Sequence, residues 1–210
     1  VYIRGEGGGA ILNRNGKLRK LNLKNANMIS SSVYYGFSPS GKYVTFSTNI
    51  IIPAFHANAE KRLEVYDSKS DVYVADLDNN RIISSPLTSD STHLETFPTF
   101  SPDGKYVYYC AADRKGLEST NLKGLKYSLV RIPFDEKTGS FGTNIDTLYK
   151  ERSVCHPKIS PDGRYCLFTV ADYGTFPIWH PEADLYMMDL QTGKVDSLSM
   201  VNSEKSDTYH

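Results

Sequence analysis

Phe100-Ser101-Pro102-Asp103-Gly104-Lys105-Tyr106 occurs, with small changes, at two other places in this chain of 210 residues. The other copies are Phe-Ser-Pro-Ser-Gly-Lys-Tyr at residues 37–43 and Ile-Ser-Pro-Asp-Gly-Arg-Tyr at residues 159–165. In each copy the proline has the φ that the second position of a turn needs, and the glycine accepts a left-handed conformation. A run with β propensity follows each turn. The sequence therefore predicts three equivalent turns between β-strands.

The spacing of these turns indicates a repeat fold. The Ser-Pro pairs begin at positions 38, 101 and 160, so they lie 63 and then 59 residues apart. A period of this length with several short strands per unit is typical of a β-propeller. We therefore predict an all-β protein, a β-propeller of four-stranded antiparallel blades with about three and a half blades in this chain.

The repeats divide the chain, residues 1–210, into parts of one partial propeller domain. We expect a half-blade (1–31), three blades (32–90, 91–150 and 151–203) and the start of a further blade (204–210). The half-blade is predicted from Asn15-Gly16, a hairpin-turn signal between two extended runs, which makes residues 10–21 resemble residues 187–198. Since an open blade face exposes apolar surface, we expect further sequence or self-association to complete the ring.

Each whole blade is expected to contain four strands. In chain order, these lie near residues 33–37, 42–48, 71–77 and 81–87, then 95–100, 105–111, 127–133 and 144–149, and finally 156–159, 164–170, 184–190 and 195–199. Residues 54–66 have the composition of one or two helical turns within a long loop.

Composition excludes several classes of function. Lys plus Arg and Asp plus Glu both number 24, so the net charge is zero and no basic surface for nucleic acid is expected. No apolar run approaches the roughly 20 residues that span a bilayer. Cys110, Cys155 and Cys166 have the spacing of neither a disulfide framework nor a zinc site, and we expect packed thiols.

No catalytic motif is present. The chain contains no G-x-S-x-G, HExxH or Walker-type sequence, and the glycine-rich residues 5–9 precede a hairpin instead of a helix. We interpret residues 5–9 as structural and predict no catalytic residue, no resident metal and no cofactor.

The repeated Ser-Pro-Asp-Gly-Lys/Arg-Tyr turns, with Asp184-Leu185-Tyr186 and its following hairpin, resemble the TolB-like, WD-repeat-like β-propeller family over nearly the whole chain. The resemblance implies a six-bladed ring and a non-enzymatic scaffold that binds a protein or peptide. It also implies an exported protein, periplasmic or associated with the outer membrane. Similar blades occur in the non-catalytic propellers of prolyl-oligopeptidase-type peptidases. The alternative function is therefore a substrate-gating propeller domain of a larger hydrolase.

Strand alternation predicts where the loops lie. Turns between the first and second strands and between the third and fourth share one face of the ring, and all other loops share the opposite face. The long insertions at residues 49–70, 113–126 and 172–183 fall on that second face, together with all five histidines and the single tryptophan. Exposed loops with aromatic residues suit a binding surface.

The candidate partner-binding residues follow from this placement. His56, Trp179 and His180 are expected to contact the partner, and Phe176 lies beside Trp179. The remaining candidates are expected near the axial channel or its mouth: Arg62, Glu64, His93, Glu95, His156 and His210. Other readings stay open. Chance can account for the gathering of histidines there, Trp179 can pack its own loop, and Arg62 and Glu64 can form a solvated pair. An enzyme with a divalent ion at the channel mouth is a third hypothesis, with His56, His156 and His180 as conceivable ligands.

Overall fold

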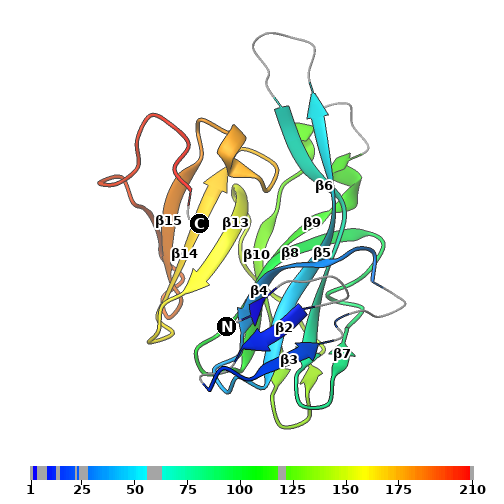
Figure 1. The fold of residues 1–210 in the computed structure, drawn as a ribbon. Helices are drawn as coiled ribbons and strands as arrows, with labels where there is room; N and C mark the ends of the chain where they lie inside the picture. Colours follow the sequence, from blue (N-terminus) through cyan, green and yellow to red (C-terminus); the bar gives the residue numbers. More distant parts are fainter. Residues whose placement is uncertain are drawn as a thin grey trace.

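A computed structural model describes residues 2–3, 9–12, 15–21, 23, 28–55, 63–117 and 122–208. For residues 2–3, 9–12, 54–55, 63–64 and 179 it describes the backbone only. The described chain forms four antiparallel sheets, arranged in chain order (Figure 1).

Three of these sheets are the expected blades. The first contains β4 (Ser32–Phe37), β5 (Tyr43–Phe55), β6 (Leu63–Asp76) and β7 (Arg81–Ile83). The second contains β8 (His93–Phe100), β9 (Tyr106–Asp113), β10 (Ser128–Asp135) and β12 (Asp146–Tyr149), with β11 (Ser140–Phe141) also paired to β10. The third contains β13 (Ser153–Ile159), β14 (Tyr165–Ala171), β15 (Asp184–Asp189) and β16 (Val195–Ser197). The prediction of four-stranded antiparallel blades is confirmed.

The N-terminal sheet is larger than predicted. β2 (Gly9–Leu12) and β3 (Leu18–Leu21) form the expected hairpin, in which Gly16 has a φ of 74°. A third strand, β1 (Tyr2–Ile3), pairs with β2. The expectation that this half-blade has two strands was wrong, because β1 contains only two residues and is too short to give an alternating hydrophobic pattern. Residues 5–8 of the glycine-rich stretch lie outside the described residues.

Hydrogen bonds close the repeated turns. The amide of Gly104 donates to the carbonyl oxygen of Ser101 at 3.0 Å, and Gly104 has a φ of 73°. The Ser101 hydroxyl donates to Asp103 at 2.6 Å and accepts from the amide of Tyr106 at 2.9 Å. The third blade repeats these contacts with Ser160 in the place of Ser101. Each turn is therefore closed by its own side chains.

The turns also lie on one face of the molecule. The amide of Leu77 donates to Lys42, that of Phe134 to Lys105, and that of Leu190 to Arg164. These bonds join the turn between the first two strands of each blade to the turn between its last two strands, and we call this side the short-turn face. The opposite side, with residues 84–92, 114–117, 122–127, 150–152 and 172–183 and the far end of β5 and β6, is the long-loop face.

The first long insertion is a β-hairpin and not a loop with helical turns. β5 and β6 pair continuously to Phe55↔Leu63, with a register shift between Ile50 and Ile51, and the hairpin projects from the blade (Figure 1). The expectation of a helix at residues 54–66 was wrong within its described part, since Ala54, Phe55 and Leu63–Tyr66 are strand. The β-branched run Ile50–Ile52 favours a strand more strongly than Ala54 and Glu64 favour a helix.

The described parts of the other two insertions contain no named strand of their own. They contain the short 3-10 helices η1 (Arg114–Leu117), η2 (Leu122–Gly124) and η3 (Pro177–Trp179). The loops pack on each other, because the amide of Gly174 donates to the carbonyl oxygen of Leu125 at 2.7 Å. Among the described residues, no helix has the length and apolar character to cross a membrane.

The hydrophobic core lies between neighbouring sheets. One cluster joins Tyr43 and Val72 of the first blade to Val107 and Phe134 of the second. Another joins the second blade to the third and contains Cys110, Cys155 and Cys166, all buried and free, as predicted. A third covers the first blade with Leu21 and Leu23. Adjacent blades therefore stabilise one another.

The last described residues form no strand. Residues 198–208 are turns and irregular chain, and the Ser206 hydroxyl donates to the carbonyl oxygen of Pro177 at 2.8 Å. The expected first strand of a further blade is not seen at Asp207 and Thr208, and Tyr209 and His210 lie outside the described residues.

Candidate functional site at the long-loop face

The innermost strands β4, β8 and β13 lie next to one another, and each contains a bulge at the same place. Tyr34, Phe97 and His156 occupy the three bulges and have φ values of 53°, 52° and 51°. Large side chains rarely adopt this left-handed conformation, which costs about 1–2 kcal/mol for each residue. A bulge changes the direction of a side chain, and here it directs all three toward the line where the blades meet.

The three rings contact one another. Phe97 lies 4.4 Å from Tyr34 and 4.0 Å from His156, measured between ring centroids. Phe176, from the loop of the third blade, lies 6.1 Å from Phe97. We call these four residues the axial cluster. Phe97 is buried, whereas Tyr34, His156 and Phe176 are partly exposed. The cluster therefore has a buried ring at its centre and partly accessible rings around it.

A buried carboxyl group lies close to this cluster. Asp67 on β6 is fully buried; its Oδ2 accepts from Asn49 at 2.9 Å, and its Oδ1 has no hydrogen-bond partner among the described residues. The Asn49 amide also donates to Thr96 Oγ1 at 2.9 Å, which joins the first blade to the second. Burial raises the pKa of Asp67 to about 7, although the hydrogen bond from Asn49 opposes the shift.

A second acidic group lies where the first blade passes into the second. Asp90 Oδ2 lies 3.0 Å from His93 Nδ1, and ligand atoms of Asp90, His93 and Glu95 all lie within 4.8 Å of one another. Glu95 is 2% exposed, and burial, with the nearby Asp71 and Asp90 carboxylates, raises its pKa to about 9. A cavity of about 190 Å³ beside this group is lined by Ser70, Asp71, Asp90 and His93, among others.

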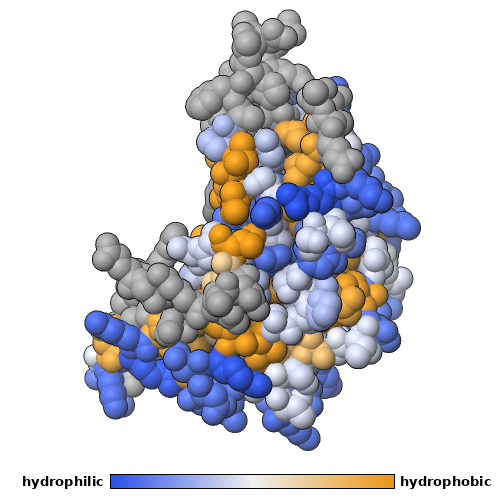
Figure 2. Space-filling model, turned by 90° about the vertical axis from the view of Figure 1, so that its right-hand side faces the viewer, coloured by the Kyte–Doolittle hydropathy of each residue, from blue (hydrophilic) through white to orange (hydrophobic). Residues whose placement is uncertain are grey.

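A larger hollow adjoins this cavity at the base of the projecting hairpin. It has a volume of about 490 Å³ and is lined by Tyr66 and Ser68 of β6, by Arg114 and Leu117 of η1, and by residues of the loop before β8. The two hollows share Ser91 and Arg114. Seen from the side, apolar residues form separate patches among hydrophilic ones in place of one continuous surface (Figure 2).

The structure separates the predicted site residues into groups. His93 and Glu95 lie together, and His156 and Phe176 lie together in the axial cluster. His180 is 6% exposed, since its Nδ1 is 3.0 Å from Glu182 and its ring packs edge-on against Tyr173 at 4.5 Å. Glu95 is buried as well, so His180, expected as a contact residue, and Glu95, expected near the axial channel, both lie beneath the surface of this face.

The structure does not describe the side chains of the other predicted residues. His56, Arg62 and His210 lie outside the described residues. The backbone of Glu64 pairs with Ala54 in the hairpin, and that of Trp179 ends η3, but their side chains are not described.

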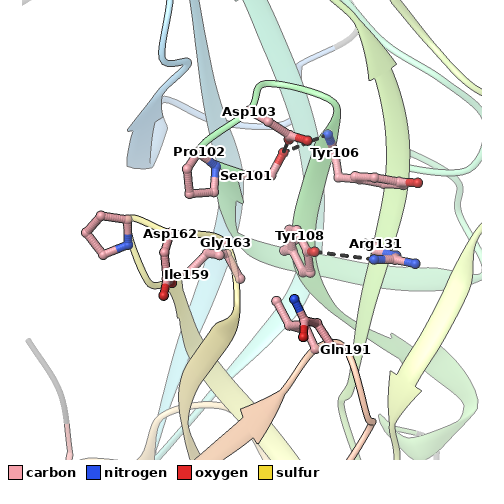
Figure 3. Close-up of a pocket in the computed structure, with 12 residues that line it drawn as sticks. Ser101, Pro102, Asp103, Tyr106, Tyr108, Arg131, Ile159, Asp162, Gly163 and Gln191 are labelled. Carbon is pink, nitrogen blue, oxygen red and sulfur yellow. Dashed lines mark hydrogen bonds between the residues drawn. The ribbon is translucent and has the colours of Figure 1, made fainter.

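The short-turn face also carries a groove that sequence reasoning missed. It has a volume of about 380 Å³ and lies between the turns of the second and third blades (Figure 3). Arg131 lies over the Tyr106 ring at 4.4 Å, and its Nε donates to Asp146 at 2.9 Å. Tyr108 and Gln191 also line the groove.

Tyr34, Phe97, Asp67 and Asp90 were likewise missed. One signal for the axial cluster exists in the sequence, because Tyr34, Phe97 and His156 each stand four residues before the serine of a Ser-Pro turn. Aligning the three repeats would have shown an aromatic ring at this position in every blade. No comparable signal marks Asp67 or Asp90, which stand in parts of the repeats that differ in length.

Comparisons with known proteins agree with this architecture. No protein-family model matches the chain. Dipeptidyl-peptidase 5 of Porphyromonas endodontalis is 38% identical over 56 residues, which cover 27% of this chain and 8% of that protein.

Two solved structures are similar over most of the chain. The putative TolB from Agrobacterium tumefaciens matches 90% of this chain and 59% of its own length, with 19% identity and a TM-score of 0.53. TolB from Acinetobacter baumannii matches 88% of this chain and 35% of its own length, with 16% identity and a TM-score of 0.52. The chain thus spans less than two thirds of each relative. It has the fold of a TolB-like β-propeller, of which it forms a part.

Proposed function

We propose that this protein is a non-enzymatic propeller scaffold that binds a protein or peptide partner through its long-loop face and channel mouth. The observation that carries the proposal is the hairpin of β5 and β6, which projects beside the hollow of about 490 Å³. Tyr66, Arg114 and Leu117 line this hollow, and tyrosine and arginine are enriched among the residues that dominate binding at protein interfaces.

The hairpin adds a second means of recognition. Among the described strands, β4 pairs with β5 only as far as Thr48, and β7 pairs with β6 only from Val74 onward. Before that pair, the amide of Val72 on β6 donates to the carbonyl oxygen of Thr88. The strand edges farther out on the hairpin are proposed to receive an extended segment of a partner, which can bind by adding a strand. Ile51 in this part is 41% exposed, so the hairpin also offers apolar contact.

The axial cluster and the predicted residues of the same face complete the proposed surface. His93 contributes an exposed group, and His156 and Phe176 contribute partly exposed ones. His56, Arg62, Glu64, Trp179 and His210 belong to the same face by their position in the repeats and remain part of the proposal. Glu95 and His180 are buried, so in this proposal they stabilise the surrounding loops and do not contact the partner.

Two matched double variants test which face binds. Tyr66→Ala with Arg114→Ala removes a tyrosine and an arginine from the hollow, whereas Tyr106→Ala with Arg131→Ala removes the same pair from the short-turn groove. Both are compared with the wild type in capture from an envelope extract, at equal melting temperature. We expect only the first variant to lose the captured protein. Loss with the second variant alone would move the binding site to the short-turn face, and no capture by the wild type would contradict the scaffold function.

The TolB-like resemblance also supports an exported protein, in the periplasm or associated with the outer membrane. Fractionation of cells that produce the native protein tests this proposal. Recovery in the cytoplasmic fraction would overturn it.

A second candidate is a substrate-gating propeller of a larger hydrolase, which the 38% identity to part of dipeptidyl-peptidase 5 favours. In that case Tyr66→Ala with Arg114→Ala should change the cleavage of long peptides by the complete protein and leave a short chromogenic dipeptide unaffected. Complete protein without peptidase activity on either substrate would exclude this candidate.

A further inference from the structure

Asp90, His93 and Glu95 have the ligand types and the spacing of a transition-metal site. Asp90 Oδ2 and His93 Nδ1 are 3.0 Å apart, which matches the roughly 3.0 Å between adjacent ligands in octahedral coordination at about 2.1 Å and is somewhat shorter than the roughly 3.4 Å of a tetrahedral site. The third ligand atom, on Glu95, lies within 4.8 Å of the other two. Ligands on opposite sides of one ion lie about 4.2 Å apart, so coordination by all three requires these side chains to move closer together.

Two buried polar atoms at this place could bind a ligand. Glu95 is 2% exposed, and its Oε2 has no hydrogen-bond partner among the described residues. Ser70 is 1% exposed, and within the same described part of the chain its Oγ also lacks a partner. Ser70 lines the cavity of about 190 Å³ together with Asp90 and His93. Buried polar groups of this kind are costly unless something binds them.

The charge balance of the group favours a cation. Three carboxyl groups, those of Asp71, Asp90 and Glu95, lie close enough to interact at this point, and Lys69 partly balances Asp71. Lys69 and Arg114 line the cavity, but the described structure records no ion pair between either side chain and these carboxylates. A divalent ion at this point would be attracted by the neighbouring carboxyl groups.

We propose that Asp90, His93 and Glu95 bind one divalent transition-metal ion, such as Zn²⁺ or Mn²⁺, on the long-loop face. One imidazole nitrogen with two carboxylate oxygens suits these ions better than Ca²⁺, which takes six to eight oxygen ligands. The ion replaces the hydrogen bonds that His93 Nδ1 makes with Asp90 Oδ2 and Thr92 Oγ1, and its remaining positions open into the cavity that Ser70 lines. His93 and Asp90 are 48% and 35% exposed, so the ion has access from solvent.

The proposed metal site would connect the first blade to the second. Asp90 stands in the loop that leaves the first blade, and Glu95 stands on β8, the inner strand of the second. Asp71, on β6 of the first blade, lines the same cavity. An ion here links the loop to β8 and lowers the repulsion between the blades.

The test is a titration of the metal-free protein with Zn²⁺ and with Mn²⁺. Calorimetry measures the binding, and the melting temperature is recorded with and without each ion. We expect one ion per chain and a higher melting temperature, with Ca²⁺ and Mg²⁺ binding more weakly. Glu95→Gln and His93→Gln should each weaken Zn²⁺ binding by at least about tenfold. His93 is at the surface, so His93→Gln is expected to fold even if Glu95→Gln does not.

Glu182→Gln is the matched control, because Glu182 also lies 3.0 Å from a histidine nitrogen but belongs to another loop. This variant should bind Zn²⁺ like the wild type. The proposal is overturned if Zn²⁺ and Mn²⁺ fail to bind at millimolar concentration, or if both cluster variants bind them as tightly as the wild type. Loss of binding in Glu182→Gln alone would place the metal at His180, and preference for Ca²⁺ or Mg²⁺ would exclude the proposed class of ion.

Discussion

At the scale of single residues, His156 has a strained left-handed backbone, and its ring contacts the axial cluster. Its φ is 51°, and its ring lies 4.0 Å from Phe97. Both alanine and glycine remove the ring, but only glycine also removes the strain. We therefore expect His156→Gly to be more stable to urea than His156→Ala by about 1 kcal/mol. Lys158, on the same strand but without a positive φ, is the control: there alanine should be more stable than glycine. Equal stability of the two His156 variants would mean that the strain is relieved elsewhere.

A second residue, Asp67, should make stability depend on pH. Its pKa is about 7 in the folded protein and 3.8 in a free side chain, so the folded state holds the proton more tightly. The stabilising contribution of the protonated carboxyl is therefore complete below about pH 4 and is lost as the pH rises through 7. The loss approaches about 1.4 kcal/mol for each pH unit within that window.

Asp67→Asn keeps an acceptor for Asn49 and has no charge to bury. We expect this variant to be more stable than the wild type at pH 8, and the advantage to disappear near pH 4. Urea unfolding at a series of pH values measures the difference between the two proteins. A difference that does not change between pH 4 and 8 would show that Asp67 has an ordinary pKa.

At the scale of elements, the serine of each repeated turn stabilises the hairpin. Ser101 Oγ accepts from the amide of Tyr106, and Ser101 is 5% exposed. Without this hydroxyl the amide loses its side-chain partner, so Ser101→Ala should lower the free energy of unfolding by about 1–2 kcal/mol. Ser140, an exposed residue of β11, bonds only to Thr138 among the described contacts, and Ser140→Ala should change stability little. Similar effects of the two variants in denaturant unfolding would argue against this role.

At the scale of the whole molecule, the cores between blades should make unfolding cooperative. Phe134 of the second blade is 4% exposed and packs edge-on against Tyr43 of the first blade at 5.1 Å. Phe134→Ala should cost about 3–5 kcal/mol and should speed amide hydrogen exchange in β5 and β6 as well as in β9 and β10. Phe37→Ala, at a residue 42% exposed, should cost much less. Faster exchange in the second blade alone would show that the blades unfold independently.

Turns and strands could be predicted because their causes are local. Proline and glycine restrict φ at residues 102 and 104 wherever the chain lies, and the runs that follow favour strands. The alternation of strands then placed the short turns on one face, as the bonds from Leu77, Phe134 and Leu190 confirm. The helix expected near residue 54 failed for the opposite reason: its weak local signal lost to strand pairing between β5 and β6.

The sequence alone was sufficient to establish the repeated antiparallel blades, the packed cysteines and the face on which the long segments lie, since short-range turn chemistry and strand alternation carry that information. The tertiary structure decided which side chains meet. Tyr34, Phe97 and His156 are 63 and 59 residues apart in the sequence, and their rings touch only because three bulges direct them to one axis. Likewise, the environments of Asp67 and Glu95 arise from neighbouring blades that exclude water, and burial of this kind is a property of the assembled sheets.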